Sequence, residues 1–309
     1  MGVKHTERDN RPGGILPIFK PAGITSHDVV NKVRRLYGTK RVGHAGTLDP
    51  MATGVLIVLV GRAAKACEYI SSDTKGYRAE MRLGITTDTE DTTGEILTRS
   101  ENIPDADKVG EVCSEFVGKI KQIPPMYSAL KVNGQKLYDL ARQGVVIERE
   151  AREIEVFSLR CEPAGNAENY VLDVECSGGT YIRTLCADIG ARLGCGAAMS
   201  ALERTEACGI SLSECHTLDE IEGMSENERE GLLLPVERLF SDLQIVRLPA
   251  FFEKLFRDGC PICQWKIKTA IAVGKRVRIA NGKGEFFALG EVVAKDAETV
   301  IKSVKIFEL

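Results

Sequence analysis

Residues 41–54 read RVGHAGTLDPMATG, and the apolar run VLIVLV follows them directly at residues 55–60. Asp49 therefore lies in a glycine-rich segment just before a predicted buried strand. The glycines permit backbone conformations that most residues avoid, and Pro50 disfavours a helical conformation of Asp49. Such a turn can present a catalytic carboxylate to a cleft, but aspartate is also an ordinary turn residue. On this stretch alone the structural interpretation is favoured, and the rest of the chain has to decide.

The composition is that of a folded protein without a membrane segment. The chain has 309 residues, 43% of them hydrophobic, which suits one large domain or a large domain with a smaller one. The longest apolar run, at residues 55–60, is too short to cross a bilayer. Residues 1–14 are charged and lack the apolar core of a signal peptide, so we expect a mobile tail on a cytoplasmic protein.

The cysteines predict reduced thiols and no metal site. Ten of them are scattered along a chain that has no secretory signal, which is typical of a cytosolic protein. Cys260 and Cys263 form a CxxC pair. A structural zinc site normally needs a second pair of ligands at matching spacing, and the histidines do not supply one nearby. We interpret the pair as chance spacing.

Charge is distributed unevenly along the chain. The net charge of −3 argues against a protein that coats nucleic acid nonspecifically. Residues 240–309, however, carry 12 Lys and Arg against 8 Asp and Glu, a net charge of +4. A second basic group precedes Asp49 and comprises Lys32, Arg34, Arg35, Lys40 and Arg41. For this group we favour a solvated surface over a phosphate-binding patch.

Local patterns predict a protein that mixes helices and strands. Alternating polarity indicates half-buried strands, apolar residues at helical spacing indicate amphipathic helices, and Asn281-Gly282 marks a hairpin turn. Predicted strands span residues 15–19, 55–60, 76–83, 154–161, 170–176, 275–280 and 285–293. Predicted helices span residues 25–36, 63–70, 106–117 and 218–230, with a further helix marked by Leu185, Ile189 and Leu193, and a domain boundary is predicted near Phe240.

Residues 122–150 break this alternation. Pro124-Pro125 opens the segment, which combines two tyrosines with four cations: Tyr127, Tyr138, Lys131, Lys136, Arg142 and Arg149. Cations that follow phosphates and rings that stack on bases suit loop or single-stranded RNA. The same segment could equally be an inert excursion, so its composition leaves both interpretations open.

Four separated motifs occur in order along the chain: KPAGITS at residues 20–26, GHAGTLDPMATG at 43–54, KGY at 75–77 and GTYIR at 179–183. Together they resemble the TruB family of tRNA pseudouridine synthases, and the resemblance runs from about Ile15 to about Arg204. Residues 122–152 also look like the RNA-binding insertion of the bacterial members. The motif around Asp49 is highly specific for the family, and it reverses the structural interpretation of that residue.

The resemblance implies a fold, a reaction and a partner. The fold is α+β, with a mainly antiparallel central sheet, flanking helices and an RNA-binding cleft. A catalytic domain is implied at residues 15–239 and a small β-rich domain like the PUA module at residues 240–309. The implied reaction converts the uridine at position 55, in the T-loop of tRNA, to pseudouridine, with no redox change and therefore no cofactor. The implied partner is the tRNA T-arm, and we expect a monomer without an obligate protein partner or membrane attachment.

The resemblance also implies roles for individual residues. The catalytic group comprises Asp49 as the carboxylate, Tyr77 as the ring that stacks on the flipped base, and Arg183 as the basic partner of Asp49. The substrate-binding group comprises His44, Tyr181, Leu202 and Lys20, the last as an ionic support, while Asp91 supports Arg183. The base must leave its stack before its glycosidic bond can be reached, and aromatic contacts recover part of that cost.

Three alternatives remain open on the sequence. A guide-RNA-dependent relative would share the chemistry, although the insertion at residues 122–152 argues against it. An RNA-binding or tRNA-folding module would carry the catalysis only incidentally. A glycosidase-like hydrolase would normally need a second partnered carboxylate. The sequence also leaves open whether Asp49 attacks the ribose C1′ or the base, or removes a ribose proton to give a glycal.

Overall fold

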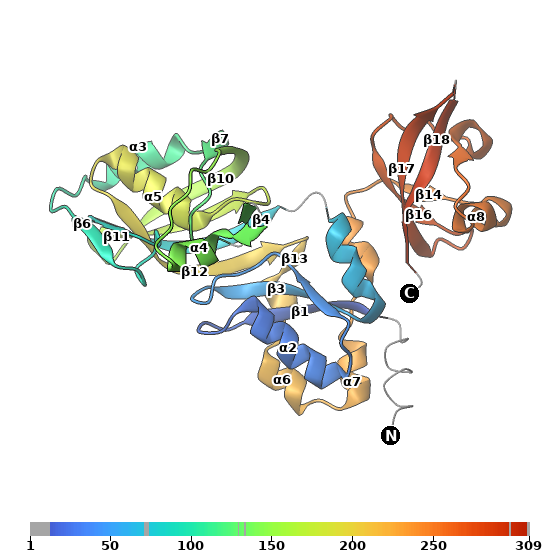
Figure 1. Ribbon diagram of the computed structural model, residues 1–309, viewed down its shortest axis with the longest axis horizontal. Coiled ribbons are helices and arrows are strands. Elements are labelled where there is room, and N and C mark those ends of the chain that lie inside the picture. Colours follow the sequence, from blue (N-terminus) through green and yellow to red (C-terminus); the bar gives the residue numbers. More distant parts are fainter. Residues whose placement is uncertain (1–12, 71–73, 129, 133, 297, 308–309) are drawn as a thin grey trace.

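The computed structural model describes residues 13–307 except 71–73, 129, 133 and 297 (Figure 1). Within these residues the main feature is a nine-stranded sheet of order β1-β3-β12-β4-β11-β10-β7, with β2 and β13 added at β3 and β12. All neighbouring strands are antiparallel except β12 and β3, which confirms the expected mixed sheet. The strands are β1 (Gly14–Lys20), β2 (Val42–Ala45), β3 (Thr53–Val60), β4 (Lys75–Leu83), β7 (Gly118–Gln122), β10 (Arg152–Ala164), β11 (Asn166–Cys176), β12 (Ala197–Ala207) and β13 (Ile210–Ser211).

The apolar run at residues 55–60 forms most of β3 and is buried on both faces. Successive side chains of a strand point to opposite faces of the sheet. The odd-numbered residues of the run pack in one core with the 3₁₀-helices η1 (Gly61–Tyr69) and η3 (Val236–Phe240), and the even-numbered residues pack in the other core with α2 (Ser26–Tyr37). The predicted buried strand is confirmed.

Helices cover the sheet where their sequence signals place them. The Thr25 side chain accepts a hydrogen bond from the Asp28 N–H and Asp28 returns the contact, so this capping box begins α2 as predicted. Figure 1 shows α3 (Ala106–Ser114) and α5 (Ile182–Leu193) over β10 and β11, and α2 beside α6 (Leu218–Gly223) and α7 (Glu226–Gly231). Among the described residues, no helix is long and apolar enough to cross a membrane.

A second sheet is built from the last part of the chain, in the order β14-β16-β17-β18-β15. The predicted hairpin at Asn281-Gly282 joins β16 to β17 and is confirmed. Phe240 is buried where this sheet meets the rest of the protein, with its ring 6.1 Å from that of Phe286 and 6.0 Å from that of Phe307. The elements are β14 (Ile245–Arg247), α8 (Ala250–Arg257), β15 (Ile262–Cys263), η4 (Gln264–Ile267), β16 (Arg276–Ala280), β17 (Phe286–Lys295) and β18 (Glu298–Ile306).

The structure differs from the local predictions in several segments: strands including β2, β7 and β12 were not predicted, and two further segments have a different structure. Residues 218–230 form the two helices α6 and α7 in place of one helical segment, because the Ser225 side chain caps the Glu228 N–H and starts α7 afresh. The segment predicted as irregular contains a short hairpin and a helix. These are β8 (Lys131–Val132), β9 (Gln135–Lys136) and α4 (Leu137–Arg142). Of the predicted tail, residues 1–12 lie outside the described residues, and Gly14 already begins β1.

The contact between β3 and β12 makes a prediction about Gly54, which pairs in parallel with Arg204. Gly54 has a φ of +102°, and a Cβ there would lie 2.2 Å from the carbonyl oxygen of Arg204. We expect Gly54→Ala to lower the free energy of unfolding by about 3 kcal/mol or more, because backbone strain adds to a collision with backbone. Urea denaturation of the purified variant measures this loss.

Gly23→Ala is the matched control for this prediction. Gly23 also has a positive φ, +86°, but nothing lies within 4 Å of its Cβ position. The control carries only the strain of the left-handed conformation, about 1 kcal/mol. Equal losses in the two variants would contradict the close approach of β3 to β12.

Candidate active site

Asp49 lies in the loop between β2 and β3, at a point where the sheet changes partner. One edge of β3 pairs with β1 over residues 54–60. The other edge pairs with β2 at residues 57–60 but with β12 only at residues 53–54. The loop of residues 46–52 leaves the sheet at the gap between these two partners. The Asp49 carboxylate is thereby displayed at the rim of the sheet, with 35% of its side chain exposed.

Arg204, on β12, fills this gap and is fully buried. Its Nε donates to the Val55 carbonyl oxygen at 2.7 Å, so the guanidinium takes the place of a strand partner for β3. Its Nη2 donates to the Gly46 carbonyl at 2.9 Å and its Nη1 to the Thr47 carbonyl at 3.4 Å. A buried cation is stable only where such acceptors surround it. Arg204 therefore fixes the backbone of Gly46 and Thr47, which lead into the Asp49 turn.

Lys20 and Ser26 hold the rest of the Asp49 loop. The fully buried Lys20 ammonium donates to the carbonyls of Pro50 at 3.2 Å and Ala52 at 2.7 Å. Burial lowers the pKa of Lys20 to about 8, while the charge of Asp49 opposes the shift. The Ser26 hydroxyl accepts from the Leu48 N–H at 2.9 Å and donates to the Leu48 carbonyl at 3.1 Å. The structure thus places Lys20 beneath the loop, as its support.

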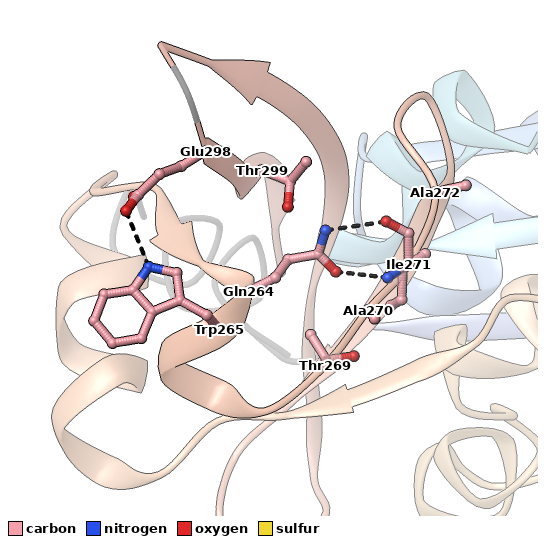
Figure 2. Close-up of a pocket in the computed structure, with 8 residues that line it drawn as sticks. All are labelled: Gln264, Trp265, Thr269, Ala270, Ile271, Ala272, Glu298 and Thr299. Atoms are coloured by element: carbon pink, nitrogen blue, oxygen red, sulfur yellow. Dashed lines mark hydrogen bonds between the residues drawn. The ribbon is translucent and has the colours of Figure 1, made fainter.

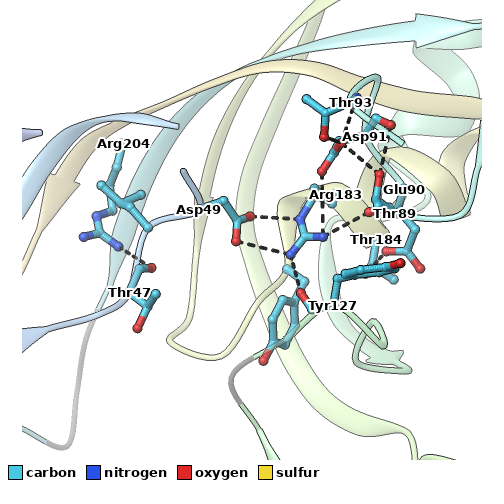
Figure 3. Close-up of polar contacts among 12 residues, drawn as sticks. Thr47, Asp49, Thr89, Glu90, Asp91, Thr93, Tyr127, Arg183, Thr184 and Arg204 are labelled. Atoms are coloured by element: carbon cyan, nitrogen blue, oxygen red, sulfur yellow. Dashed lines mark hydrogen bonds and ion pairs between the residues drawn. The ribbon is translucent and has the colours of Figure 1, made fainter. Parts of the chain in front are cut away.

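Arg183 binds the Asp49 carboxylate through both oxygens (Figure 3). Its Nε lies 2.9 Å from Oδ2 and its Nη2 lies 3.3 Å from Oδ1. Arg183 stands in the first turn of α5, and only 5% of its side chain is exposed. A two-point contact between planar groups fixes the orientation of both partners. The partly exposed Asp49 carboxylate is therefore held in one orientation by the buried Arg183 guanidinium.

The remaining donors of Arg183 reach two other segments. Its Nη1 donates to the Thr89 carbonyl at 3.0 Å and lies 3.8 Å from Oδ2 of Asp91, while its Nη2 donates to the Tyr127 carbonyl at 2.8 Å. Asp91 is held in turn by the Thr89 hydroxyl and by the N–H and hydroxyl of Thr93. The structure brings Asp49, Asp91 and Arg183 together, and Tyr127 adds the start of the insertion to the same network.

Tyr77 lies next to Arg204 in the sheet, and His44 is close enough for its pKa to respond to the charge of Arg204. Tyr77 on β4 pairs with Arg204 in the sheet, and burial raises the pKa of its phenol, an effect that the charge of Arg204 opposes. His44 is on β2, and burial, followed by the charge of Arg204, lowers the pKa of its imidazole. Its buried Nδ1 has no hydrogen-bond partner among the described residues, so it is available to a ligand.

Tyr181 and Leu202 complete the predicted set. Tyr181 is the N-cap residue of α5. The Gln122 side-chain amide accepts a hydrogen bond from the Tyr181 N–H at 2.8 Å and donates one to the Tyr181 carbonyl at 3.0 Å. Burial raises the pKa of the Tyr181 phenol, and the charge of Asp49 acts in the same direction. Leu202 is on β12, two residues before Arg204, and is buried in the same core as Tyr77.

Sequence reasoning missed Arg204 and Gln122 as parts of the site. Both side chains bond to backbone groups. Because nearly every residue type carries the same backbone groups, such contacts leave no signal in the sequence of the partner segment. Lys32 and Arg34 of the basic group before Asp49 make contacts within the fold, while Arg35, Lys40 and Arg41 are exposed as predicted. Lys32 forms ion pairs with Glu222 at 2.8 Å and Asp219 at 3.5 Å, and Arg34 donates to the Val42 carbonyl at 3.2 Å. No cluster of metal-binding side chains occurs in the described part of the chain.

Solved structures with this fold identify the class of protein. The chain matches the structure of a Cbf5-Nop10-Gar1 complex with a TM-score of 0.74 and 26% sequence identity, covering 97% of this chain and 88% of that chain. An archaeal box H/ACA sRNP Nop10-Cbf5 complex gives a TM-score of 0.69 at 23% identity, with coverage of 98% and 90%, and shows the fold alone. The protein therefore has the pseudouridine synthase fold.

Sequence comparisons identify the family. Models of the TruB family pseudouridylate synthase N-terminal domain and of the tRNA pseudouridylate synthase B C-terminal domain match residues 34–182 and 183–241. The tRNA pseudouridine synthase B of Alkaliphilus oremlandii is 50% identical over 96% of this chain and 98% of its own length. That of Clostridium perfringens is 41% identical over 90% and 94%. The chain is thus an enzyme of the TruB family of pseudouridylate synthases.

We predict that Thr184 holds the turn that carries Asp91 in position beside Arg183. The Thr184 hydroxyl donates to the Glu90 carboxylate, and Glu90 has a left-handed backbone with a φ of +64°. Without this contact the strained turn can relax away from Arg183. We expect Thr184→Val to lower the kcat for pseudouridine formation about tenfold with little change in KM, the cost of one hydrogen bond to a charged group.

Thr184→Ser is the matched control, because it keeps the hydroxyl and removes only a methyl group. Its kcat should stay close to that of the wild type. Urea denaturation of both variants separates loss of positioning from loss of folding. Equal kcat values for the valine and serine variants would rule out a role for the Thr184 hydroxyl in positioning.

Proposed function

We propose that this enzyme converts the uridine at position 55 in the T-loop of tRNA to pseudouridine, with Asp49 as the catalytic carboxylate. The observation that carries the proposal is the partly exposed Asp49 carboxylate bound through both oxygens by the buried Arg183. The names of the relatives, tRNA pseudouridine synthase B, support tRNA as the substrate. A tRNA substrate is also consistent with a cytoplasmic enzyme.

The reaction needs a carboxylate and no cofactor. The bond between ribose C1′ and the base N1 breaks, a bond between C1′ and C5 forms, the proton on C5 passes to solvent, and N1 takes up a proton from solvent. No electrons are gained or lost. Asp49 is well suited to this chemistry, because Arg183 fixes its orientation before substrate binds and spares the cost of ordering it in the transition state.

The base must be flipped out of the T-loop to reach Asp49. We assign the flipped base to Tyr77 by stacking, and the walls of its pocket to His44, Tyr181 and Leu202. Only 8% of Tyr77 is exposed, so the base reaches its ring after neighbouring side chains move. His44 supports this assignment through its unpartnered Nδ1, which can bond to the flipped nucleotide. Lys20, Asp91 and Arg204 act by holding Asp49 and Tyr77 in place.

The insertion at residues 122–152 is proposed to bind the T-arm. It is anchored at its start by the contact of Arg183 with the Tyr127 carbonyl, which joins RNA binding to the orientation of Asp49. We propose residues 15–239 as the catalytic domain and residues 240–309 as a PUA-like RNA-binding domain. We further propose a monomer that acts without guide RNA or an obligate protein partner.

An assay of tritium release tests this function. A bare tRNA transcript labelled with tritium at uridine C5 should release label with the wild-type protein alone, because C5 loses its proton as the C1′–C5 bond forms. Asp49→Asn keeps the size of the side chain but removes its charge, and we expect its rate to fall on the order of 10³-fold or more. Release is counted over time with both proteins in parallel.

Binding of the same transcript by Asp49→Asn serves as the control for folding. Equal release by wild type and variant would exclude Asp49 as the catalytic residue. No release by the wild type on bare tRNA, with release restored by a guide RNA, would favour the guide-dependent alternative. If tRNA refolding were the main role, Asp49→Asn would promote it as well as the wild type and rescue a deletion strain.

A further inference from the structure

The C-terminal sheet contains a pocket of about 540 Å³ that the site around Asp49 does not use (Figure 2). It lies outside residues 34–241, the span matched by the two family models. A volume of this size is typical of sites for small ligands or single nucleotides. The lining residues are Gln264, Trp265, Thr269, Ala270, Ile271, Ala272, Glu298 and Thr299.

Gln264 makes one wall of the pocket rigid. Its side chain is almost fully buried, and the amide donates to the Ile271 carbonyl at 3.0 Å and accepts from the Ile271 N–H at 2.7 Å. This pair of bonds resembles the hydrogen bonding of a neighbouring strand, as the two dashed lines between Gln264 and Ile271 in Figure 2 show. The loop of residues 269–272 is therefore fixed in place before any ligand arrives.

Trp265 forms the opposite side and is presented to solvent. Its side chain is 65% exposed, although an indole of this size normally finds a partner to pack against. The ring is nevertheless held in one orientation, because its Nε1 donates to Oε1 of Glu298 at 3.1 Å. An exposed aromatic ring with a fixed edge offers its face for stacking.

Hydrogen bonds to both carboxylate oxygens fix the orientation of Glu298. Its Oε2 accepts a hydrogen bond from the Cys263 thiol at 2.9 Å while its Oε1 accepts from Trp265. Each carboxylate oxygen has a second lone pair, so the group can still accept from a ligand. Cys263 of the CxxC pair therefore helps to orient Glu298, a role that the spacing of the two cysteines did not predict.

Two lysines beside the pocket in the chain can bind an anionic group of a ligand, while the charged side chain in the lining itself is the Glu298 carboxylate. Lys266 and Lys268 are exposed and flank Trp265 and Thr269 in the chain, and the Lys266 ammonium lies 5.3 Å from the centre of the indole ring. Residues 240–309 together carry a net charge of +4 in a protein whose net charge is −3. Basic side chains beside an exposed ring suit the phosphate and base of a nucleotide.

We propose that this pocket binds an unpaired nucleotide of the RNA substrate, outside the loop that is modified. The base stacks on Trp265, its exocyclic amino group donates to Glu298, and the phosphate lies by Lys266 and Lys268. Cytosine, adenine and guanine carry such an amino group and uracil does not, so the pocket discriminates against uracil. The proposal rests on the proposed function in taking RNA as the substrate.

Fluorescence tests the proposal directly, because Trp265 is the only tryptophan of the chain. Titration with single-stranded oligocytidylate should quench its emission, and oligouridylate should bind at least about fivefold more weakly. Glu298→Gln keeps an acceptor for the Trp265 N–H but can also donate to uracil, so it should bring the two affinities within about twofold. No change of emission with any oligonucleotide would overturn the proposal.

Trp265→Leu provides a second test, read by the anisotropy of a labelled oligocytidylate. We expect its Kd to rise about tenfold, the typical effect of losing one stacked ring. Phe251→Leu is the matched control: Phe251 is 69% exposed on α8 but does not line the pocket, so its Kd should not change. An unchanged Kd for Trp265→Leu, or an equal rise in both variants, would refute the assignment.

Kinetics separate this inference from the proposed function. Trp265→Leu should lower kcat/KM on full-length tRNA about tenfold and leave kcat/KM on an isolated T-arm stem-loop unchanged. A wild-type protein that isomerises neither RNA would refute the proposed function, while the oligonucleotide titrations would still decide the pocket. Equal loss on both RNAs would refute the pocket and leave the proposed function standing.

Discussion

Arg204 is a fully buried cation that donates to three backbone carbonyls around Asp49, and the site depends on this arrangement. A buried charge costs several kcal/mol unless acceptors surround it, and inward-facing carbonyls are costly unless donors reach them. Lys20 meets the same condition on the far side of the turn. The buried cations supply donors to the carbonyls, and the carbonyls supply acceptors to the cations. With the carbonyls of the loop directed inward, the Asp49 side chain is left at the rim, where Arg183 binds it.

Arg183 converts three separate segments into one unit. It bonds to the loop of Asp49, to the turn of Thr89 and Asp91, and to the insertion at Tyr127. Because all these partners share one guanidinium, a shift of the insertion changes the surroundings of the carboxylate. An arginine is suited to this role, since its planar group offers five donors in fixed directions. The insertion proposed to bind RNA and the carboxylate proposed for catalysis thereby share one guanidinium.

The sequence predicted those parts of the fold whose signals are local. The Thr25 cap, the apolar run at residues 55–60 and the Asn281-Gly282 turn each specify structure over a few residues, and the structure agrees with them. Strand β12 was not predicted, because bulges after Met199 and Arg204 break its alternation. The Asp49 motif singled out the candidate carboxylate. Arg204 was overlooked as its support, because contacts to carbonyls place no demand on the identity of the partner residue.

The pairing of Gly54 with Arg204 joins parts of the chain that are synthesised far apart in time. The loop around Asp49 leaves the ribosome 149 to 158 residues before the guanidinium that fixes it. Closing so long a connection costs entropy, and parallel contacts of this kind form slowly. A nascent chain that has not yet reached β12 therefore has Lys20 and Ser26 to hold the loop but lacks the Arg204 guanidinium. The loop around Asp49 completes its contacts only after β12 has been synthesised.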